Sequence, residues 1–410
     1  MKKNTYKQSK IGKIPKEWDA VVFADIAKLV KEGYKPTGND DFAYIGLEHI
    51  NQQSLSLNSI GHSTEVESNK FAFKSGDILF GKLRPYFRKV YRPSFSGICS
   101  TDIWVVRAKE GIDQGFLFYF MANQDFVNMA SSGSSGTKMP RADWDHLKGT
   151  PWKKPPISEQ RSTAKILSDL DEKIENNNNM NKTLETIGQA LFKRWFVDFK
   201  FPGHEKVRFV NGLPEGWERK PIGGYVQVVG GSTPSTIDPS FWRDEGINWA
   251  TPKDLAALDD EVLLDTERKI TEEGLNEIGS GLLPVGTVLL SSRAPIGYLA
   301  IAEIPVAINQ GFIAIICNNK VPNIYVKEWV KHNLDVIKGL ANGTTFMEIS
   351  KSSFRSILMT MPTQEIMDSF MLAVYSSYLQ IVENVKQNKS LRNIRDSLLP
   401  KLMSGEIRVL

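Results

Sequence analysis

A run of basic and aromatic side chains between residues 82 and 92 is the first place where this sequence could do chemistry. It contains five cations and three aromatic rings, and no acidic residue interrupts it. Arginine can donate two hydrogen bonds to a guanine edge, and lysine and arginine both neutralise phosphate. The run indicates a nucleic-acid surface, although a solvated pair of strands would explain the same charges. The candidate DNA contacts in it are Lys82, Arg84, Arg88, Lys89 and Arg92.

A second basic cluster follows the glycine- and serine-rich stretch 131–136 and contains Lys138 and Arg141. The second half of the chain has fewer cations, but amide and hydroxyl side chains there could read base edges. We therefore expect two DNA-binding surfaces of different composition. The candidate contacts of the second surface are Ser292, Arg293, Asn309, Gln310, Lys351 and Arg355.

Residue patterns typical of catalysis are missing from the sequence. The five histidines lie far apart and have no spacing typical of a zinc site. There is no G-x-x-x-x-G-K-[ST] phosphate loop and no G-x-S-x-G nucleophile turn. Cys99 and Cys317 are interpreted as structural cysteines. We expect no catalytic residues, no metal site and no cofactor bound by this chain.

The composition is that of an ordinary globular protein, with 41% hydrophobic and 24% charged residues among 410. At about 150 residues per domain, this length allows two to three domains. The net charge of +4, from 51 basic and 47 acidic residues, is too small to indicate a nucleic-acid partner by itself. No apolar run of about eighteen residues occurs, Met1–Lys10 is polar, and the two cysteines are far apart. These features predict a cytoplasmic protein without a membrane partner.

An internal repeat organises the chain. Ile-Pro-Lys-Glu-Trp at 14–18 recurs 199 residues later as Leu-Pro-Glu-Gly-Trp at 213–217, and the pattern of 76–79 recurs at 286–289. The offset changes where loops are expected and is constant elsewhere, as insertions between fixed elements would produce. The sequence therefore predicts a duplicated unit of roughly 200 residues.

Each copy begins with strand-rich sequence and continues into helical sequence. Short buried strands at 77–80 and 103–106 have counterparts at 287–290 and 312–316. An α/β (α+β) domain with a mostly antiparallel or mixed sheet is therefore expected in each copy. Apolar residues three and four positions apart predict shorter helices over 116–128 and 324–337.

Each copy closes with one long helix that carries a heptad seam. The first is expected over residues 158–195, with Ser158 as its N-cap, and the second from just beyond Pro362 to near Pro400, because proline cannot continue a helix. Neither seam is apolar enough to be stable alone, so we expect the two helices to pair. The pairing residues predicted for the first helix are Leu167, Leu170, Ile174, Asn177, Asn181, Leu184 and Leu191. Those of the second helix are Val374, Ile381, Asn384, Asn388, Leu391 and Leu398.

Two asparagines lie near the middle of each seam. In an antiparallel pair, Asn177, Asn181, Asn384 and Asn388 would meet in one buried layer. Buried asparagines can hydrogen-bond across such an interface and fix its register at some cost in stability. The alternative is that 175–181 is a solvated, weakly helical stretch.

Three motifs resemble the specificity subunits of type I restriction-modification systems. Pro-Ile-Ser-Glu-Gln at 156–160, leading into Ile-Leu-Ser-Asp-Leu-Asp-Glu-Lys-Ile at 166–174, resembles the opening of that family's conserved region. Leu-Pro-Glu-Gly-Trp at 213–217 resembles the start of its second target-recognition domain, and 398–407 resembles its C-terminal tail. The resemblance covers nearly the whole chain. One departure is Pro-Thr-Gln-Glu-Ile at 362–366, where the Glu-Gln pair is reversed.

The resemblance implies two pseudo-symmetric globular target-recognition domains separated by two long antiparallel coiled-coil helices. Each domain would read one half of a bipartite, asymmetric site in double-stranded DNA. The helices would dock two copies of the modification methyltransferase subunit, which are joined by motor-nuclease restriction subunits. S-adenosylmethionine, ATP and magnesium would then bind only to the partner subunits.

The domain boundaries expected from these patterns are 1–156 for the first recognition domain, 157–197 for the central helix, 198–362 for a linker and the second recognition domain, and 363–410 for the C-terminal helix and tail. Two other functions remain open at this point. One is a non-catalytic helical-hairpin scaffold that does not bind DNA. The other is a nuclease or methyltransferase whose catalytic site is not recognisable from the sequence.

Overall fold

The computed structural model describes residues 6–38, 40–134, 138–343 and 347–409. The chain divides into two compact units. Unit 1 consists of Met1–Ile174 together with Ser390–Leu410, and unit 2 is the continuous stretch Glu175–Lys389. Each unit is therefore a globular domain with its own segment of both long helices.

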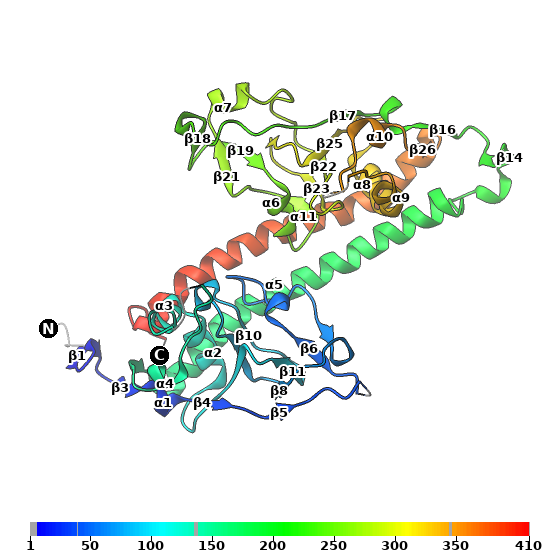
Figure 1. Ribbon diagram of the computed structural model, residues 1–410. Helices are drawn as coiled ribbons and strands as arrows, with labels where there is room; N and C mark the ends of the chain where they lie inside the picture. Colours follow the sequence, from blue (N-terminus) through cyan, green and yellow to red (C-terminus); the bar gives the residue numbers. More distant parts are fainter. Residues whose placement is uncertain (1–5, 39, 135–137, 344–346, 410) are drawn as a thin grey trace. The chain divides into compact units, whose positions relative to one another are not determined.

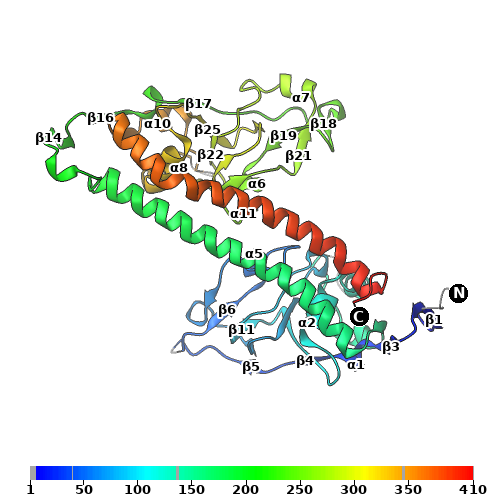
Figure 2. The same cartoon turned by 180° about the vertical axis from the view of Figure 1, so that it is seen from behind.

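The two long helices are α5 (Ile157–Phe192) and α11 (Gln364–Ser404), which lie side by side in Figures 1 and 2. They run antiparallel, because Asn177 contacts Asn388 while Asn181 contacts Asn384. Helix α5 begins one residue earlier than predicted, so Ser158 lies inside its first turn and is not its N-cap. At its other end, a π-helical turn, η4 (Lys193–Val197), follows Phe192.

Helix α11 continues through Pro400, so the prediction that it ends there is wrong. A proline inside a helix costs about 3 kcal/mol. Leu399, Leu402 and Met403 are buried in the core of unit 1, and this packing stabilises the last turn. The helix ends instead at Ser404 and is followed by Gly405, whose φ of 78° is a left-handed conformation that glycine adopts without strain.

The described part of unit 1 contains two main sheets and two short two-stranded pairs. The first sheet is antiparallel, with strand order β10-β9-β12-β4, and the second is mixed, with order β5-β8-β11-β6-β7. The strands of the first sheet are β4 (Ala27–Val30), β9 (Ile78–Gly81), β10 (Val90–Tyr91) and β12 (Ile103–Ala108). Those of the second sheet are β5 (Gly33–Tyr34), β6 (Ala43–Ile45), β7 (Gly61–His62), β8 (Lys70–Phe73) and β11 (Gly97–Ser100). The two pairs are β1 (Tyr6–Ser9) with β2 (Gly12–Pro15) and β3 (Asp19–Val22) with β13 (Pro151–Lys154).

Unit 2 repeats this plan, with one strand more in its first sheet and one fewer in its second. Its sheet β17-β25-β22-β23-β20 corresponds to β4-β12-β9-β10, and β18-β21-β19-β24 is again mixed. The strands of the first sheet are β17 (Gln227–Val229), β20 (Val262–Leu263), β22 (Val288–Ser291), β23 (Leu299–Ala302) and β25 (Phe312–Ile316). Those of the second sheet are β18 (Trp242–Arg243), β19 (Ile247–Ala250), β21 (Arg268–Ile270) and β24 (Ala307–Ile308). The two pairs are β14 (Phe209–Val210) with β15 (Leu213–Pro214) and β16 (Glu218–Pro221) with β26 (Leu358–Met361).

The structure confirms the duplication and the α/β class with mixed sheets. The predicted strands correspond to β9, β12, β22 and β25. The shorter helices of unit 1 are α1 (Phe23–Ile26), α2 (Gln114–Ala122), α3 (Gln124–Ser132) and α4 (Trp144–Lys148). Those of unit 2 are α6 (Pro252–Ala256), α7 (Glu272–Asn276), α8 (Asn323–His332), α9 (Leu334–Gly339) and α10 (Lys351–Arg355).

Each of the two shorter helices predicted from apolar spacing is two helices. Asn123 separates α2 from α3 in an extended conformation (φ −68°, ψ 142°), and Asn333 separates α8 from α9. Asparagine forms local hydrogen bonds that compete with the helix, and the Asn333 amide donates to the carbonyl of Trp329. The breaks occupy equivalent places in the two units, which is a further sign of the duplication.

Candidate nucleic-acid interface

The loop after β9 brings the two basic clusters of the first half together. The backbone N–H of Arg84 donates to the carbonyl of Pro140 at 2.7 Å, and that of Ala142 donates to Lys82 at 2.8 Å. Leu83 forms an isolated antiparallel bridge with Arg141. Stretches nearly sixty residues apart in the sequence thus form one surface of unit 1.

Four of the predicted cations lie on this surface and are half-buried or exposed. Lys138 is exposed, and Lys82 is half-buried with no ion pair recorded among the described residues. Arg84 has a left-handed backbone (φ 50°), and its guanidinium lies 6.0 Å from the ring of Phe87. Arg141 is paired with Asp102 through two contacts, of 3.0 and 3.3 Å, and this pairing raises the pKa of its guanidinium.

The other three cations of the run have partners inside unit 1, and one of them, Arg88, is buried. Arg88 is buried against α11, where it lies 3.5 Å from Asp396, and burial lowers the pKa of its guanidinium. The ammonium of Lys89 donates to the carbonyl of Leu47. Arg92 packs over the ring of Phe118 at 5.6 Å. Arg88 is therefore removed from the set of DNA contacts, while Lys89 and Arg92 are half-buried, as Lys82 and Arg84 are, and remain candidates.

The second unit has the same backbone arrangement with different side chains. The carbonyl of Ser292 accepts from the N–H of Ile349 at 3.1 Å, as that of Lys82 does from Ala142. Arg293 forms the bridge with Glu348, and their side chains lie 3.6 Å apart. The positions of Leu83 and Arg141 are thus taken by an arginine and a glutamate. Equivalent positions in the two units therefore present different hydrogen-bonding groups.

The remaining candidates of the second unit differ in how accessible they are. Gln310 is exposed and accepts from the Thr233 hydroxyl at 2.6 Å, and Lys351 is exposed over Gly230. Ser292 is buried, so it is removed from the set of DNA contacts. The other two have intramolecular partners: Asn309 accepts from the N–H of Gly311 at 2.9 Å, and Arg355 donates to the carbonyl of Val228.

Sequence reasoning missed a loop that borders the first surface. Gln53 adopts φ 63° and donates from its side chain to the carbonyl of Tyr86 at 3.1 Å. Its neighbour Gln52 is exposed. Two adjacent glutamines in a polar loop were the available signal, but only the fold shows that the loop lies beside Tyr86.

The structure brings the four seam asparagines together as two pairs, one helical turn apart, and not as a single four-way layer. The amide nitrogen of Asn177 donates to the side-chain oxygen of Asn388 at 2.8 Å, and that of Asn384 donates to Asn181 at 2.8 Å. The four side chains are 0–4% exposed, so these amide bonds are shielded from water. Asn181 also donates to Asp260 at 3.0 Å, which connects the helices to the globular part of unit 2.

The other predicted pairing residues are buried or half-buried. Their positions along each helix follow the heptad seam. Buried among them are Leu167, Ile174, Val374 and Ile381; half-buried are Leu170, Leu184, Leu191, Leu391 and Leu398.

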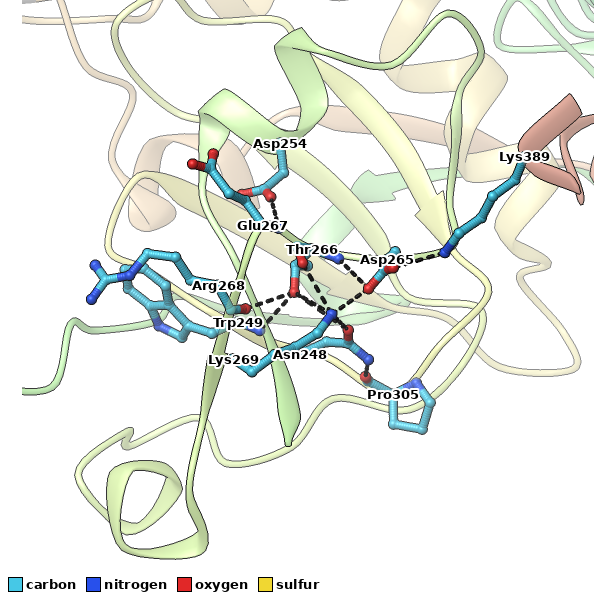
Figure 3. Close-up of polar contacts among 10 residues, drawn as sticks. All are labelled: Asn248, Trp249, Asp254, Asp265, Thr266, Glu267, Arg268, Lys269, Pro305 and Lys389. Atoms are coloured by element: carbon cyan, nitrogen blue, oxygen red, sulfur yellow. Dashed lines mark hydrogen bonds and ion pairs between the residues drawn. The ribbon is translucent and has the colours of Figure 1, made fainter. Parts of the chain in front are cut away.

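A polar network fastens the second sheet of unit 2 to α11 (Figure 3). Lys389 of α11 donates to Asp265 at 2.7 Å. Lys269 donates to the same carboxylate, to Asn248 at 2.6 Å and to the carbonyl of Thr266 at 3.0 Å. These lysines hold the pKa of Asp265 at about 2 against the opposing effect of burial.

A second charged cluster lies where α5 meets α8, beside a cavity of about 540 Å³. Lys327 lies 3.0 Å from Glu261 and 3.1 Å from Glu328, and both Lys327 and Glu328 are buried. Glu185 of α5 lines the same cavity and has one carboxylate oxygen without a hydrogen-bond donor. Burial, reinforced by Glu261, raises its pKa to about 7.

No three potential metal ligands gather within residues 6–38, 40–134, 138–343 and 347–409. In the same residues, no helix is long and apolar enough to cross a membrane. Burial raises the pKa of both Cys99 and Cys317 to about 12, so neither thiol is an activated nucleophile.

Comparison with known proteins agrees with this geometry. The model of the type I restriction modification DNA specificity domain matches residues 15–186 and again 214–389. The chain is 24% identical to the type I restriction enzyme HindI specificity subunit of Haemophilus influenzae, over 95% of this chain and 100% of that protein. It is 26% identical to the MjaIX specificity subunit of Methanocaldococcus jannaschii, over 98% and 96%.

A crystal structure of the type I restriction-modification system S subunit from M. genitalium has the same fold. It aligns with a TM-score of 0.56 at 15% identity, covering 94% of this chain and 96% of that one. The two family matches together span well over half of the sequence and coincide with the two copies of the internal repeat. The chain therefore belongs to the family of type I restriction-modification DNA specificity subunits and carries two copies of the specificity domain.

Proposed function

We propose that each specificity domain of this chain reads one half of a bipartite, asymmetric site in double-stranded DNA. The recognition domains would comprise residues 1–156 and 198–362, and the helical segments 157–197 and 363–410. The single observation that carries the proposal is the loop after β9 and its counterpart after β22. Their backbones are bridged in the same way, while the bridge joins Leu83 to Arg141 in one unit and Arg293 to Glu348 in the other.

A conserved backbone with different side chains is what two readers of different sequences require. The backbone places the side chains in the same way in each unit, and the side-chain donors and acceptors select the bases. The predicted contacts of the first surface that are not buried are Lys82, Arg84, Lys89, Arg92, Lys138 and Arg141. Those of the second are Arg293, Asn309, Gln310, Lys351 and Arg355.

We further propose that α5 and α11 dock two copies of the modification methyltransferase subunit, with motor-nuclease restriction subunits joining the assembly. Leu372, Tyr375 and Leu379 support this role, because they are 84%, 51% and 48% exposed along one stripe of α11. The chain itself would have no catalytic role, and S-adenosylmethionine, ATP and magnesium would bind to its partners. The proposed location is the cytoplasm, where the free thiols of Cys99 and Cys317 would stay reduced.

The test is to map methylated adenines in cells with and without this gene, and to repeat the map with Arg84→Ala. The proposal expects a split motif that disappears on deletion and loses specificity in one half in the variant. Lys109→Ala is a matched control, because Lys109 is an exposed cation of unit 1 outside the two basic clusters. An unchanged methylome on deletion, with no DNA binding by the chain and its modification partner together, would favour the helical-hairpin scaffold.

A further inference from the structure

Arg268 of unit 2 is stacked on a tryptophan, and it is not among the DNA contacts predicted from the sequence. Arg268 begins β21, and its guanidinium carbon lies 3.4 Å from the ring centre of Trp242 and 5.3 Å from that of Trp249. The two indoles contact each other edge-on, with ring centres 5.0 Å apart. Figure 3 shows the Arg268 side chain beside Trp249, at the opposite end of the network from Lys389.

The tryptophan pair is itself held in place by the backbone. The indole N–H of Trp249 donates to the carbonyl of Ser232 at 3.2 Å, and that of Trp242 donates to Ser235 at 2.9 Å. Since both rings are fixed, the plane of the stacked guanidinium is fixed with them. A pre-oriented arginine loses less conformational entropy when it binds than a mobile one does.

The acidic neighbours of Arg268 are occupied by other cations. Glu267 binds Lys253 at 2.6 and 3.0 Å, and Asp265 binds Lys269 and Lys389. In the part of the chain that the structure describes, no ion pair or hydrogen bond is recorded for the guanidinium of Arg268, and the residue is exposed. Its N–H donors are therefore free for a ligand.

The residues 230–235 connect Arg268 to the proposed DNA surface of unit 2. Thr233 of this segment holds Gln310, and Lys351 lies over Gly230 at its other end. Ser232 and Ser235, in the same segment, hold the two tryptophans. One short stretch of backbone thus supports a lysine, a glutamine and a stacked arginine.

We propose that Arg268 reads a guanine of the second half-site, with Trp242 as its positioning residue. The inference rests on the proposed function of the specificity domains. A guanidinium of fixed plane suits the paired O6 and N7 acceptors that guanine presents in the major groove. If Arg268 instead bound a phosphate, only its positive charge would matter, and the affinity would not depend on which base is present.

The experiment uses the chain purified with its modification subunit and duplexes that carry each single-base change in the second half-site. Arg268→Ala should lose the preference for guanine at one position by about 5- to 150-fold, while preferences elsewhere stay unchanged. Arg268→Lys should lose the same preference although it keeps the charge, and Trp242→Ala should weaken it. Arg243→Ala is the matched control, because Arg243 lies on the neighbouring strand and donates to the carbonyl of Glu245.

Two results would overturn the assignment while leaving the proposed function intact. One is an unchanged preference in Arg268→Ala. The other is an equal loss of binding for every duplex, which indicates a phosphate contact. If the wild-type complex methylates no split motif, both the proposed function and this inference are wrong.

Discussion

The buried ion pair between Arg395 and Asp171 gives the sharpest prediction for stability. Arg395 lies on the seam of α11 with a side chain only 2% exposed, and it donates to Asp171 of α5 at 2.6 Å. The Tyr119 hydroxyl donates to the other carboxylate oxygen at 2.7 Å, and burial together with Asp171 raises the pKa of that hydroxyl. Asp396, 3.1 Å from Arg395, is the second acid in contact and is half exposed.

Replacing Asp171 with asparagine removes the stronger counter-charge but leaves the guanidinium buried. A buried charge that loses its partner costs roughly 3–5 kcal/mol, and because Asp396 remains, the lower end of that range applies, about 3 kcal/mol. Arg395→Met removes the buried charge instead and leaves Asp171, 26% exposed, still bonded to Tyr119. We expect that variant to cost about 1 kcal/mol, and the double variant about the same.

Because the chain has two units, a single unfolding midpoint does not report on this pair alone. The opening free energy from amide hydrogen exchange in residues 160–174 of α5 is the appropriate measurement. The reasoning is refuted if Asp171→Asn and Arg395→Met destabilise equally, or if the double variant shows the sum of the two single effects.

Three further predictions concern other parts of the molecule. Asn177→Leu or Asn388→Leu alone should destabilise the chain by about 1–3 kcal/mol, because the remaining buried amide loses the hydrogen bond across the helices and keeps only its bond to Asn178 or Gln387. The double variant should cost less than the sum of the two, and additive effects in denaturant unfolding would show that the two amides are not coupled. Burial raises the pKa of Glu185 to about 7 from the ordinary 4.5, so the folded chain binds a proton more tightly than the unfolded chain and stability falls as pH rises through this interval. Glu185→Gln should therefore stabilise unit 2 by roughly 1–3 kcal/mol at pH 8 and by nearly nothing at pH 4, which the opening free energy from amide hydrogen exchange in unit 2 at both pH values checks. In DNA titrations, Lys82→Ala should weaken all sequences alike and reduce the salt slope by about one, whereas Arg84→Ala should cost about 1–3 kcal/mol at one position of the first half-site; the reverse pattern would exchange their roles.

The helical part of this fold could be predicted from the sequence because periodicity is local information. The seam positions, the duplication and the pairing of asparagines across two helices all follow from spacing. Spacing does not show where a tertiary contact overrides it. Pro400 is tolerated because the leucines around it are buried, and Asn123 interrupts a stretch whose apolar pattern is otherwise helical.

The DNA-contact candidates could be predicted only in part, because burial is a property of the fold. Arg88 and Arg84 look alike in the sequence, yet one is buried against α11 and the other remains at the surface. Arg268 does not lie in a run of basic residues that would mark it in the sequence. The ring on which it stacks belongs to Trp242, twenty-six positions earlier. Composition indicates which segments are basic, but only strand pairing shows which cation is stacked and free.

The chain enters and leaves unit 2 at neighbouring points, and this affects how recombination could exchange that unit. Unit 2 begins at Glu175 and ends at Lys389, and next to these two points Asn177 and Asn388 are hydrogen-bonded to each other. The whole unit is therefore an insertion whose two ends meet, and exchanging it requires only two crossovers, both at the asparagine pair. A foreign unit that kept these two residues would carry its own halves of both helices in the correct register. Such an exchange would replace one half of the recognised site in a single step while unit 1 kept its own sequence and core.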